Sequence, residues 1–183
     1  MRKTQLIRGG DYWESVFYQA DQQIARQKIS AHGVEEQEGE IPDGRVKFLD
    51  DASKTYGEEY YKNGKKYGLS KTYYASGQLM KEENYEDGKL QTGKEYYDNG
   101  SLRFEVDYQD KRDCPGNKGE VGVGKLYFKN GVLRYEWNLT RTSRTGFKKS
   151  YNRNGELTLE AYYDEKCQLI QPRDDFIKSA TDH

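Results

Sequence analysis

The sequence contains few cysteines, prolines and histidines, and it has no long apolar run. The two cysteines, Cys114 and Cys167, form no disulfide framework and no CxxC motif for zinc or redox chemistry. We expect two free thiols in a reducing compartment, with a single bridge as the alternative. No window holds the roughly 18 apolar residues of a membrane span, and the first residues hold no apolar run of the kind that a signal peptide needs. These absences predict a soluble, cytoplasmic protein.

An excess of charge of one sign is missing as well, because 30 Lys and Arg face 31 Asp and Glu for a net charge of −1. That balance excludes both a generally basic nucleic-acid binder and an acidic disordered tail. Apolar residues make up only 33% of the chain, and 17 of them are Tyr. With 19 Gly and only 3 Pro, this composition indicates short strands and tight turns rather than disorder or a helical bundle.

What the sequence does have is an internal repeat. Four glycines anchor it, at spacings of 23, 31 and 24 residues: Gly77, Gly100, Gly131 and Gly155. A Lys lies six residues before each anchor, and these are Lys71, Lys94, Lys125 and Lys149. A Glu lies five residues after each anchor, and these are Glu82, Glu105, Glu136 and Glu160. The long interval contains an inserted loop at residues 110–119, and an earlier unit at 46–64 extends the array, which covers residues 41–166.

Each anchor glycine marks the turn of a β-hairpin. The Asn-Gly pair at three of the four anchors predicts a two-residue type I′ turn, in which both central residues adopt positive φ. This turn places each repeat Lys opposite the repeat Glu, and such cross-strand pairs contribute about 0.2–1 kcal/mol each. The same register places Tyr97 opposite Leu102. It lines up Leu102, Phe104 and Val106 on an apolar face and leaves a Lys, Glu and Tyr surface on the other.

The repeat resembles a known family. The unit that begins at Gly93, GKEYYDNGSLRFEVDY, resembles the MORN repeat in its bacterial second variant, and the string YKNGKKYGLSKTYYASGQLMKEENYEDGK is similar to tandem repeats of the YwqK-type antitoxin family. The resemblance covers residues 41–166. It implies an all-β array of hairpins with a binding role on the antitoxin side of a toxin–antitoxin pair. MORN repeats elsewhere are associated with phospholipid and protein contacts, so the resemblance implies these contacts too.

The two ends of the chain depart from the repeat. Residues 11–33 fit either a helix, with an apolar stripe that includes Val16, Phe17 and Ile24, or a degenerate hairpin that turns near Asp21. We favour the hairpin, because the terminal unit of a repeat array closes the stack and is atypical. Residues 1–40 are then a degenerate hairpin unit followed by an acidic connection at 34–40, and residues 167–183 are a C-terminal tail.

No catalytic constellation emerges from the sequence. The two histidines, His32 and His183, are interpreted as surface residues, and no His lies near Cys114 in the sequence to form a thiolate pair. The repeat Glu residues could in principle bind a cation or act as acid and base, but each has a Lys predicted opposite, which favours an ion-pair ladder. We therefore expect no enzyme, no metal and no cofactor.

The tyrosines of the polar face are the candidate binding residues. They would form an aromatic row flanked by charge, with two arginines opposite, and Tyr and Arg are favoured at binding hot spots. The candidates are Tyr73, Tyr96, Tyr127, Tyr151, Arg103 and Arg134. The alternative is that these tyrosines brace the sheet through cross-strand packing.

The sequence as a whole predicts an all-β fold, an elongated antiparallel array of five to six β-hairpin units in a MORN-like meander. We expect a non-enzymatic repeat protein that binds a protein partner, which includes an antitoxin- or immunity-like role against a toxin. The alternatives are a surface module for membrane phospholipid or glycan and a structural spacer. No nucleic-acid partner is expected, and exposed edge strands would allow oligomers to form.

Overall fold

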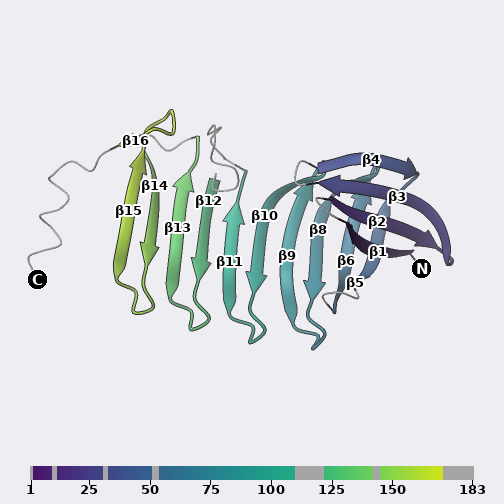
Figure 1. Cartoon of the computed structure of the whole chain (residues 1–183), viewed down its shortest axis with the longest axis horizontal. Coiled ribbons are helices and arrows are strands. Elements are labelled where there is room, and N and C mark those ends of the chain that lie inside the picture. The colour runs from purple at the N-terminus through teal and green to yellow at the C-terminus, as the bar shows by residue number, and fades with distance from the viewer. Residues whose placement is uncertain are drawn as a thin grey trace, which may run out of the picture. The chain divides into compact units, whose positions relative to one another are not determined.

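The structure, a computed structural model, describes residues 2–9, 12–30, 33–50, 54–109, 122–141 and 145–170 (Figure 1). These residues form sixteen strands joined by turns, and no helix occurs among them. The chain divides into two compact units, unit 1 with residues 1–91 and 98–100 and unit 2 with residues 92–97 and 101–183. The all-β meander of consecutive hairpins expected from the repeat is confirmed.

Unit 1 is a sheet with the strand order β9-β8-β6-β5-β1-β2-β3-β4, and β7 pairs with β6. Its strands are β1 (Arg2–Gly9), β2 (Tyr12–Gln19), β3 (Gln22–Ser30), β4 (Gly33–Gly39), β5 (Gly44–Asp50), β6 (Thr55–Lys62), β7 (Lys65–Lys66), β8 (Gly68–Tyr73) and β9 (Leu79–Glu86). Strands β1 and β5 pair in parallel, with Lys3 opposite Lys47, whereas the other described pairs are antiparallel. A four-stranded meander therefore precedes β5 and adds to its free edge.

The first described residues of the chain are strands. Strands β2 and β3 form a hairpin around Ala20 and Asp21, whose positive φ angles of 48° and 64° fit a type I′ turn. The segment expected as an acidic connection is instead strand β4, because its backbone pairs with β3 and Gln27 Nε2 donates to Gln37 Oε1 at 2.9 Å. The acidic side chains of β4 are exposed, and charge on an outer strand discourages pairing with another chain.

The N-terminal strands cover one face of unit 1, here called its inner face. Phe17 on β2 and Ala25 on β3 pack with Val46 on β5 and Tyr61 on β6 in one buried cluster. The rings of Phe17 and Tyr61 meet edge to face with their centroids 5.3 Å apart. Because β2 and β6 are not neighbours in the strand order, this contact shows that the sheet of unit 1 folds over on itself (Figure 1). Burial of a side chain such as Phe17 contributes about 1.5–3 kcal/mol.

Unit 2 has the strand order β16-β15-β14-β13-β12-β11-β10. Its strands are β10 (Lys89–Tyr96, which begins in unit 1), β11 (Leu102–Asp107), β12 (Gly122–Tyr127), β13 (Leu133–Leu139), β14 (Gly146–Tyr151), β15 (Leu157–Tyr163) and β16 (Leu169–Ile170). Its buried apolar residues are Val106, Trp137 and Leu139. The Trp137 ring lies against Gly124 on the opposite strand, where an added Cβ would overlap the ring. A large residue thus faces a residue without a side chain.

The repeat turns differ from the predicted type. Only the glycine adopts positive φ, for example 86° at Gly131. Gly131 N donates to Phe128 O at 2.8 Å, and Phe128 N donates to Val132 O at 2.8 Å. This pattern is a three-residue loop in which a type I turn is followed by a left-handed glycine. The prediction of type I′ turns at the anchors is therefore wrong. Such turns lie between the repeats instead, at Asn63-Gly64 and Asp87-Gly88, where both residues adopt positive φ.

A β-bulge restores the predicted register beyond each longer loop. Glu95 pairs with Phe104 but Tyr96 pairs with Leu102, so Arg103 is the extra residue. The extra loop residue and the bulge offset one another, and all four repeat Lys residues lie opposite the predicted Glu. The placement of Tyr97 opposite Leu102 is wrong, since Tyr97 N donates to Ser101 O at 2.8 Å.

Candidate binding surface

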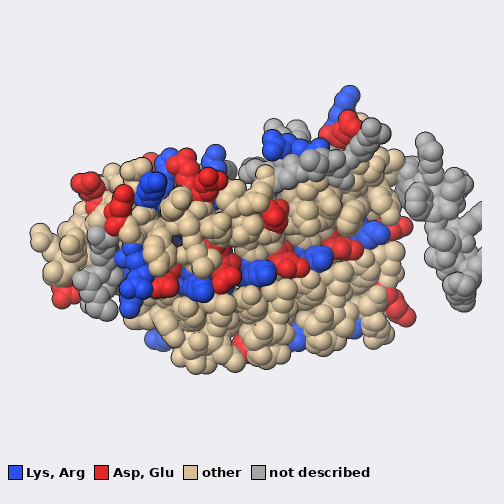
Figure 2. Space-filling view, turned by 180° about the vertical axis from the view of Figure 1, so that it is seen from behind, with Lys and Arg blue, Asp and Glu red and all other residues tan. Residues whose placement is uncertain are grey.

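One face of each unit, here called the outer face, carries a row of alternating Lys and Glu that we call the ladder. In unit 2 the ladder consists of Lys94, Glu105, Lys125, Glu136, Lys149 and Glu160, each opposite the next. In unit 1 it consists of Lys47, Glu58, Lys71 and Glu82. Figure 2 shows a row in which basic and acidic residues alternate. The pairs between neighbouring hairpins were not predicted from the sequence. They place each ladder Glu that is not at an end of its row between two lysines.

The geometry of the ladder favours ion pairing over chemistry. Lys71 Nζ lies 3.4 Å from Glu82 Oε2, and Lys149 Nζ lies 3.7 Å from Glu160 Oε2. Roughly a third of each of these side chains is exposed, so each pair contributes about 0.2–1 kcal/mol. Among the described residues, no group of three His, Cys, Asp or Glu side chains could hold a metal ion.

Two of the candidate tyrosines are bound to the ladder. The Tyr127 hydroxyl donates to Glu105 Oε1 at 2.8 Å, and the Tyr151 hydroxyl donates to Glu136 Oε1 at 2.7 Å. Burial, and then the hydrogen bond to Glu105, raise the pKa of Tyr127 to about 12. Burial, and then the hydrogen bond to Glu136, raise the pKa of Tyr151 to about 12 in the same way. Each of these hydroxyls is hydrogen-bonded to a neighbouring strand of the same sheet, which supports a role in stabilising the sheet.

The remaining candidates do not form one exposed row. Tyr73 is half-buried and stacks on Tyr56, with the ring centroids 5.4 Å apart, and Tyr96 is also half-buried. Arg103 Nη1 lies 3.1 Å from Glu95 Oε2. Arg134 is exposed, and its guanidinium carbon lies 5.6 Å from the centroid of the Phe128 ring. The structure thus places Tyr73 in a stacking contact, Arg103 in an ion pair and Arg134 in a cation–π contact.

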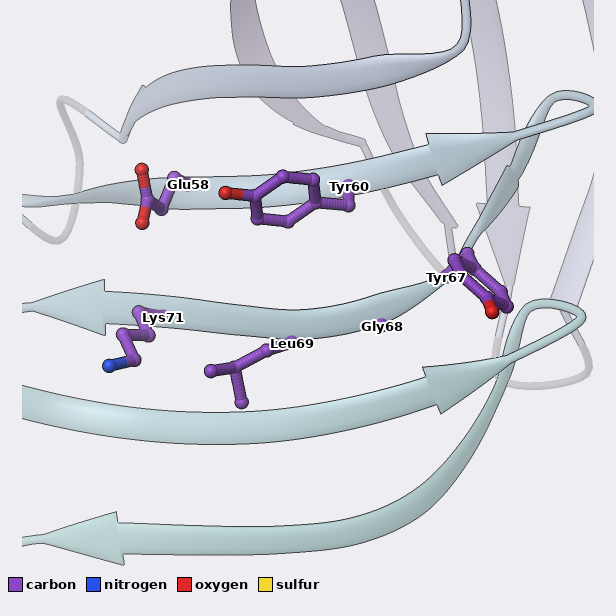
Figure 3. Close-up of a pocket in the computed structure, with 6 residues that line it drawn as sticks. All are labelled: Glu58, Tyr60, Tyr67, Gly68, Leu69 and Lys71. Atoms are coloured by element: carbon purple, nitrogen blue, oxygen red, sulfur yellow. The ribbon is translucent and has the colours of Figure 1, made fainter.

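A hollow of about 330 Å³ on the outer face of unit 1 gathers residues that were not among the binding candidates predicted from the sequence. It is lined by Glu58, Tyr60, Tyr67, Gly68, Leu69 and Lys71. Figure 3 shows Glu58 and Tyr60 on one strand, Leu69 and Lys71 on the next, and Tyr67 at the bend that leads into the second strand. The exposed fraction is 38% for Tyr60, 49% for Tyr67 and 42% for Leu69. These three apolar side chains meet solvent together.

The hollow exists because β6 has two partners along the same edge. Its end, Tyr61–Lys62, pairs with the short strand β7, whereas Tyr56–Glu58 pair with β8. Between the two partners the chain bends at Tyr67 and Gly68, where Gly68 adopts a φ of 71° and Tyr67 N donates to Tyr60 O at 2.8 Å. Because of the bend, Tyr67 lies beside the outer face, where it lines the hollow.

Charged groups surround the hollow. Arg45 Nη1 lies 3.4 Å from Glu58 Oε2, and Glu58 lies opposite Lys71. Lys62 Nζ lies 5.3 Å from the centroid of the Tyr67 ring, a cation–π contact. An apolar centre with a charged rim is the arrangement typical of protein interfaces.

A polar cluster on the inner face anchors the strands beneath the hollow. Lys66 Nζ lies 2.6 Å from Glu59 Oε1, and the Tyr61 hydroxyl donates to Glu59 Oε2 at 2.9 Å. The Tyr85 hydroxyl donates to Glu83 Oε2 at 3.2 Å. Burial, followed by the Glu59 carboxylate, raises the pKa of Tyr61 well above its usual value, and burial likewise raises the pKa of Tyr85. The raised pKa values favour the neutral hydroxyls, which donate to the two carboxylates.

The structure also bears on the expected thiols and on membrane insertion. Cys167 is disulfide-bonded, contrary to the expected free thiol. The chain's other cysteine, Cys114, and the histidines His32 and His183 lie outside the described residues. In the part of the chain that the structure describes, no helix has the length and apolar character to cross a membrane.

Comparison with known families identifies the repeat. The family model for a MORN repeat variant matches three segments, residues 66–87, 92–110 and 120–139. Each segment contains one repeat Lys and its opposing Glu, so the family model and the ladder mark the same hairpins. No curated protein matches the sequence, and no relative confirms the resemblance to the YwqK-type antitoxin family. Three MORN-type repeats are thus found between residues 66 and 139.

Two solved structures show remote similarity. A mutant of S. aureus TarM in complex with Fondaparinux, alpha-GlcNAc-glycerol and UDP aligns with a TM-score of 0.28 and 14% identity over 72% of this chain and 21% of that chain. A second TarM structure aligns with a TM-score of 0.23 and 12% identity, over 76% of this chain and 20% of that one. This chain spans about a fifth of those proteins, and such scores carry no argument about fold or function.

Proposed function

We propose that this protein is a non-enzymatic, protein-binding repeat module and that the outer face of unit 1 is its contact surface. The observation that carries the proposal is the exposed set of Tyr60, Tyr67 and Leu69 around one hollow. In unit 2, by contrast, Tyr127 and Tyr151 use their hydroxyls within the sheet. Clustered, solvent-exposed Tyr with apolar neighbours is the composition of binding hot spots.

The charge around the hollow supports a protein partner in particular. Glu58, Arg45 and Lys71 provide both signs of charge beside the apolar centre. A mixed rim allows complementary charge pairs, which set orientation and specificity. An anionic membrane surface would be better matched by a rim of lysines and arginines alone.

A capture experiment with matched variants tests the proposal. The full chain is immobilised and incubated with extract of its native host, beside a variant with Tyr60→Ser, Tyr67→Ser and Leu69→Ser. A control variant carries Leu157→Ser and Leu159→Ser, which are exposed apolar residues of unit 2. We expect a specific protein to be retained by the wild type and by the control but not by the triple variant, with unchanged Tm for all three. Equal retention by the triple variant would rule out this surface.

The resemblance to an antitoxin family is the reason to include a toxin among the partners. If the captured protein arrests growth when it is expressed alone, co-expression of this chain is expected to restore growth and co-expression of the triple variant is not. Binding to anionic vesicles instead of to any protein would favour the membrane alternative.

A further inference from the structure

Two arginines of unit 2 lie against one aromatic ring. The guanidinium carbons of Arg134 and Arg153 are 5.6 Å and 6.0 Å from the centroid of the Phe128 ring. Phe128 precedes the turn between β12 and β13, Arg134 lies on β13, and Arg153 lies in the turn between β14 and β15. Both arginines are exposed. The shared ring holds two cations near each other at the turn end of the sheet.

These two guanidinium groups lack a carboxylate partner among the described residues. The ion pairs of the described chain involve neither Arg134 nor Arg153. The carboxylate in the turn of Arg153 is Glu156, which accepts a hydrogen bond from Asn152 Nδ2 at 2.6 Å. Each ladder Lys lies opposite a Glu, whereas neither of these arginines is paired with a carboxylate of the described residues.

The preceding hairpin shows what is missing. Arg103 and Arg134 both lie three residues after the anchor glycine of their hairpin, and both are the extra residue of a β-bulge. Arg103 pairs at 3.1 Å with Glu95, which follows the repeat Lys. The residue that follows the repeat Lys in the next hairpin is Leu126. Arg134 therefore occupies the position of Arg103, but Leu126 occupies the position of Glu95.

We propose that Phe128, Arg134 and Arg153 form a binding site for an acidic segment of a partner protein, with a carboxylate bound by the two guanidinium groups. The proposal rests on the protein-binding function and adds a second contact in unit 2. A carboxylate is the group that the same bulge arginine binds in the preceding hairpin, and guanidinium groups bind carboxylates through paired hydrogen bonds. The ring already orients both arginines, so a ligand need not order them from free rotation.

A titration followed by NMR tests the site on the full chain. The probe is a blocked hexapeptide of Glu residues, and its counterpart with Gln in place of Glu is the uncharged control. We expect the Nε–Hε signals of Arg134 and Arg153 to shift with the Glu peptide and not with the Gln peptide. Added salt is expected to weaken the binding, because exposed charges are screened. Arg134→Gln and Arg153→Gln are each expected to weaken it about tenfold, whereas Arg103→Gln leaves it within about twofold.

A second pair of variants separates charge from folding. Leu126→Glu introduces a carboxylate at the position that Glu95 has in the preceding hairpin. It is expected to weaken peptide binding about tenfold, because the new carboxylate would form an ion pair with Arg134. Leu126→Gln, which has the same size and no charge, is expected to keep the affinity. Absent shifts, equal effects of Arg103→Gln and Arg134→Gln, or shifts caused only by phosphatidylserine vesicles would each overturn the proposal. The triple variant of the unit 1 hollow is expected to bind the peptide normally, so the failure of one site is distinguishable from the failure of the other.

Discussion

Units 1 and 2 share one repeat but use their tyrosines differently. In unit 2 the hydroxyls of Tyr127 and Tyr151 donate to ladder glutamates, so the rings brace the sheet. In unit 1 Tyr60 and Tyr67 are exposed around a hollow where β6 changes partner from β7 to β8. Tyr127 and Tyr151 of the repeat columns are thus bonded within the sheet, whereas the residues of the proposed contact surface lie where the chain departs from the columns.

The two units also bury their inner faces by different means. Unit 1 folds its N-terminal strands over the sheet, which brings Phe17 against Tyr61. Unit 2 packs Trp137 against Gly124, with the Phe104 ring 6.0 Å from the Trp137 ring. The first solution needs contacts between distant strands, and the second needs only the three consecutive strands β11, β12 and β13. Substitutions in each core therefore test whether the units are stabilised separately.

The largest effect is expected from Phe17→Ala. Phe17 is 1% exposed at the centre of the unit 1 cluster, and loss of a buried Phe ring costs about 3–5 kcal/mol. Hydrogen exchange measured by NMR is expected to show lost protection on β2, β5 and β6 with retained protection on β12 and β13. Equal loss in both units would show that the cores are not separate.

A smaller effect is expected from Gly124→Ala in unit 2. The added methyl group would overlap the Trp137 ring, and overpacking of this kind costs about 1–3 kcal/mol. Urea denaturation measures the loss, and Trp fluorescence reports the displaced ring. Gly100→Ala would be a poor control, since Gly100 adopts a φ of 82°. Ser101→Ala, in a neighbouring turn, is expected to leave the Trp signal unchanged.

The hydroxyls of unit 2 give the next prediction. Tyr127→Phe and Tyr151→Phe are each expected to cost about 1 kcal/mol, since each removes a partly exposed hydrogen bond to a carboxylate, and Tyr60→Phe is expected to cost nothing measurable. Because the pKa of Tyr127 and of Tyr151 is raised to about 12 in the folded state, their contribution is complete below pH 10 and is lost as the pH rises toward 12. Ultraviolet titration of the single variants checks the assignment, and a wild-type curve without groups that titrate near pH 12 would contradict it.

The smallest effect is expected in the ladder. Lys125→Glu places a third carboxylate between Glu105 and Glu136, and we expect a loss of about 1 kcal/mol or less that diminishes at high salt. Thermal unfolding at two salt concentrations measures it. Lys129→Glu, in an exposed turn, is the matched charge reversal, and an equal effect there would show that net charge rather than the ladder is responsible.

Local patterns were enough to predict the all-β hairpin repeat and the Lys–Glu pairs within each hairpin. The predicted turn had one loop residue too few, but the unforeseen bulge at Arg103 compensated for it, so Lys94 still lies opposite Glu105. The strongest turn signal, Asn-Gly, does not distinguish a type I′ turn from a type I turn followed by a left-handed glycine. That distinction depends on the twist and pairing of the flanking strands rather than on the dipeptide.

Features that depend on distant contacts could not be predicted. The composition of β4 indicates only solvent exposure, whereas its pairing with β3 depends on how the N-terminal strands fold over unit 1. The hollow was missed because Tyr67 and Gly68 fall between repeat columns, although a Tyr-Gly pair that interrupts the repeat was a usable signal. The contact of Arg153 with the Phe128 ring likewise joins a loop residue of one hairpin to the preceding hairpin.

The central claim is that the tyrosines of unit 1 bind while those of unit 2 brace the sheet. The most direct test measures two quantities on two variants: the affinity for the captured partner, by calorimetry, and the Tm. The first variant carries Tyr60→Ser, Tyr67→Ser and Leu69→Ser, and the second carries Tyr127→Phe and Tyr151→Phe. We predict that the first variant loses binding and keeps its Tm, and that the second keeps binding and has a lower Tm. The reverse pattern, in which the unit 2 variant loses binding at an unchanged Tm, would contradict the account.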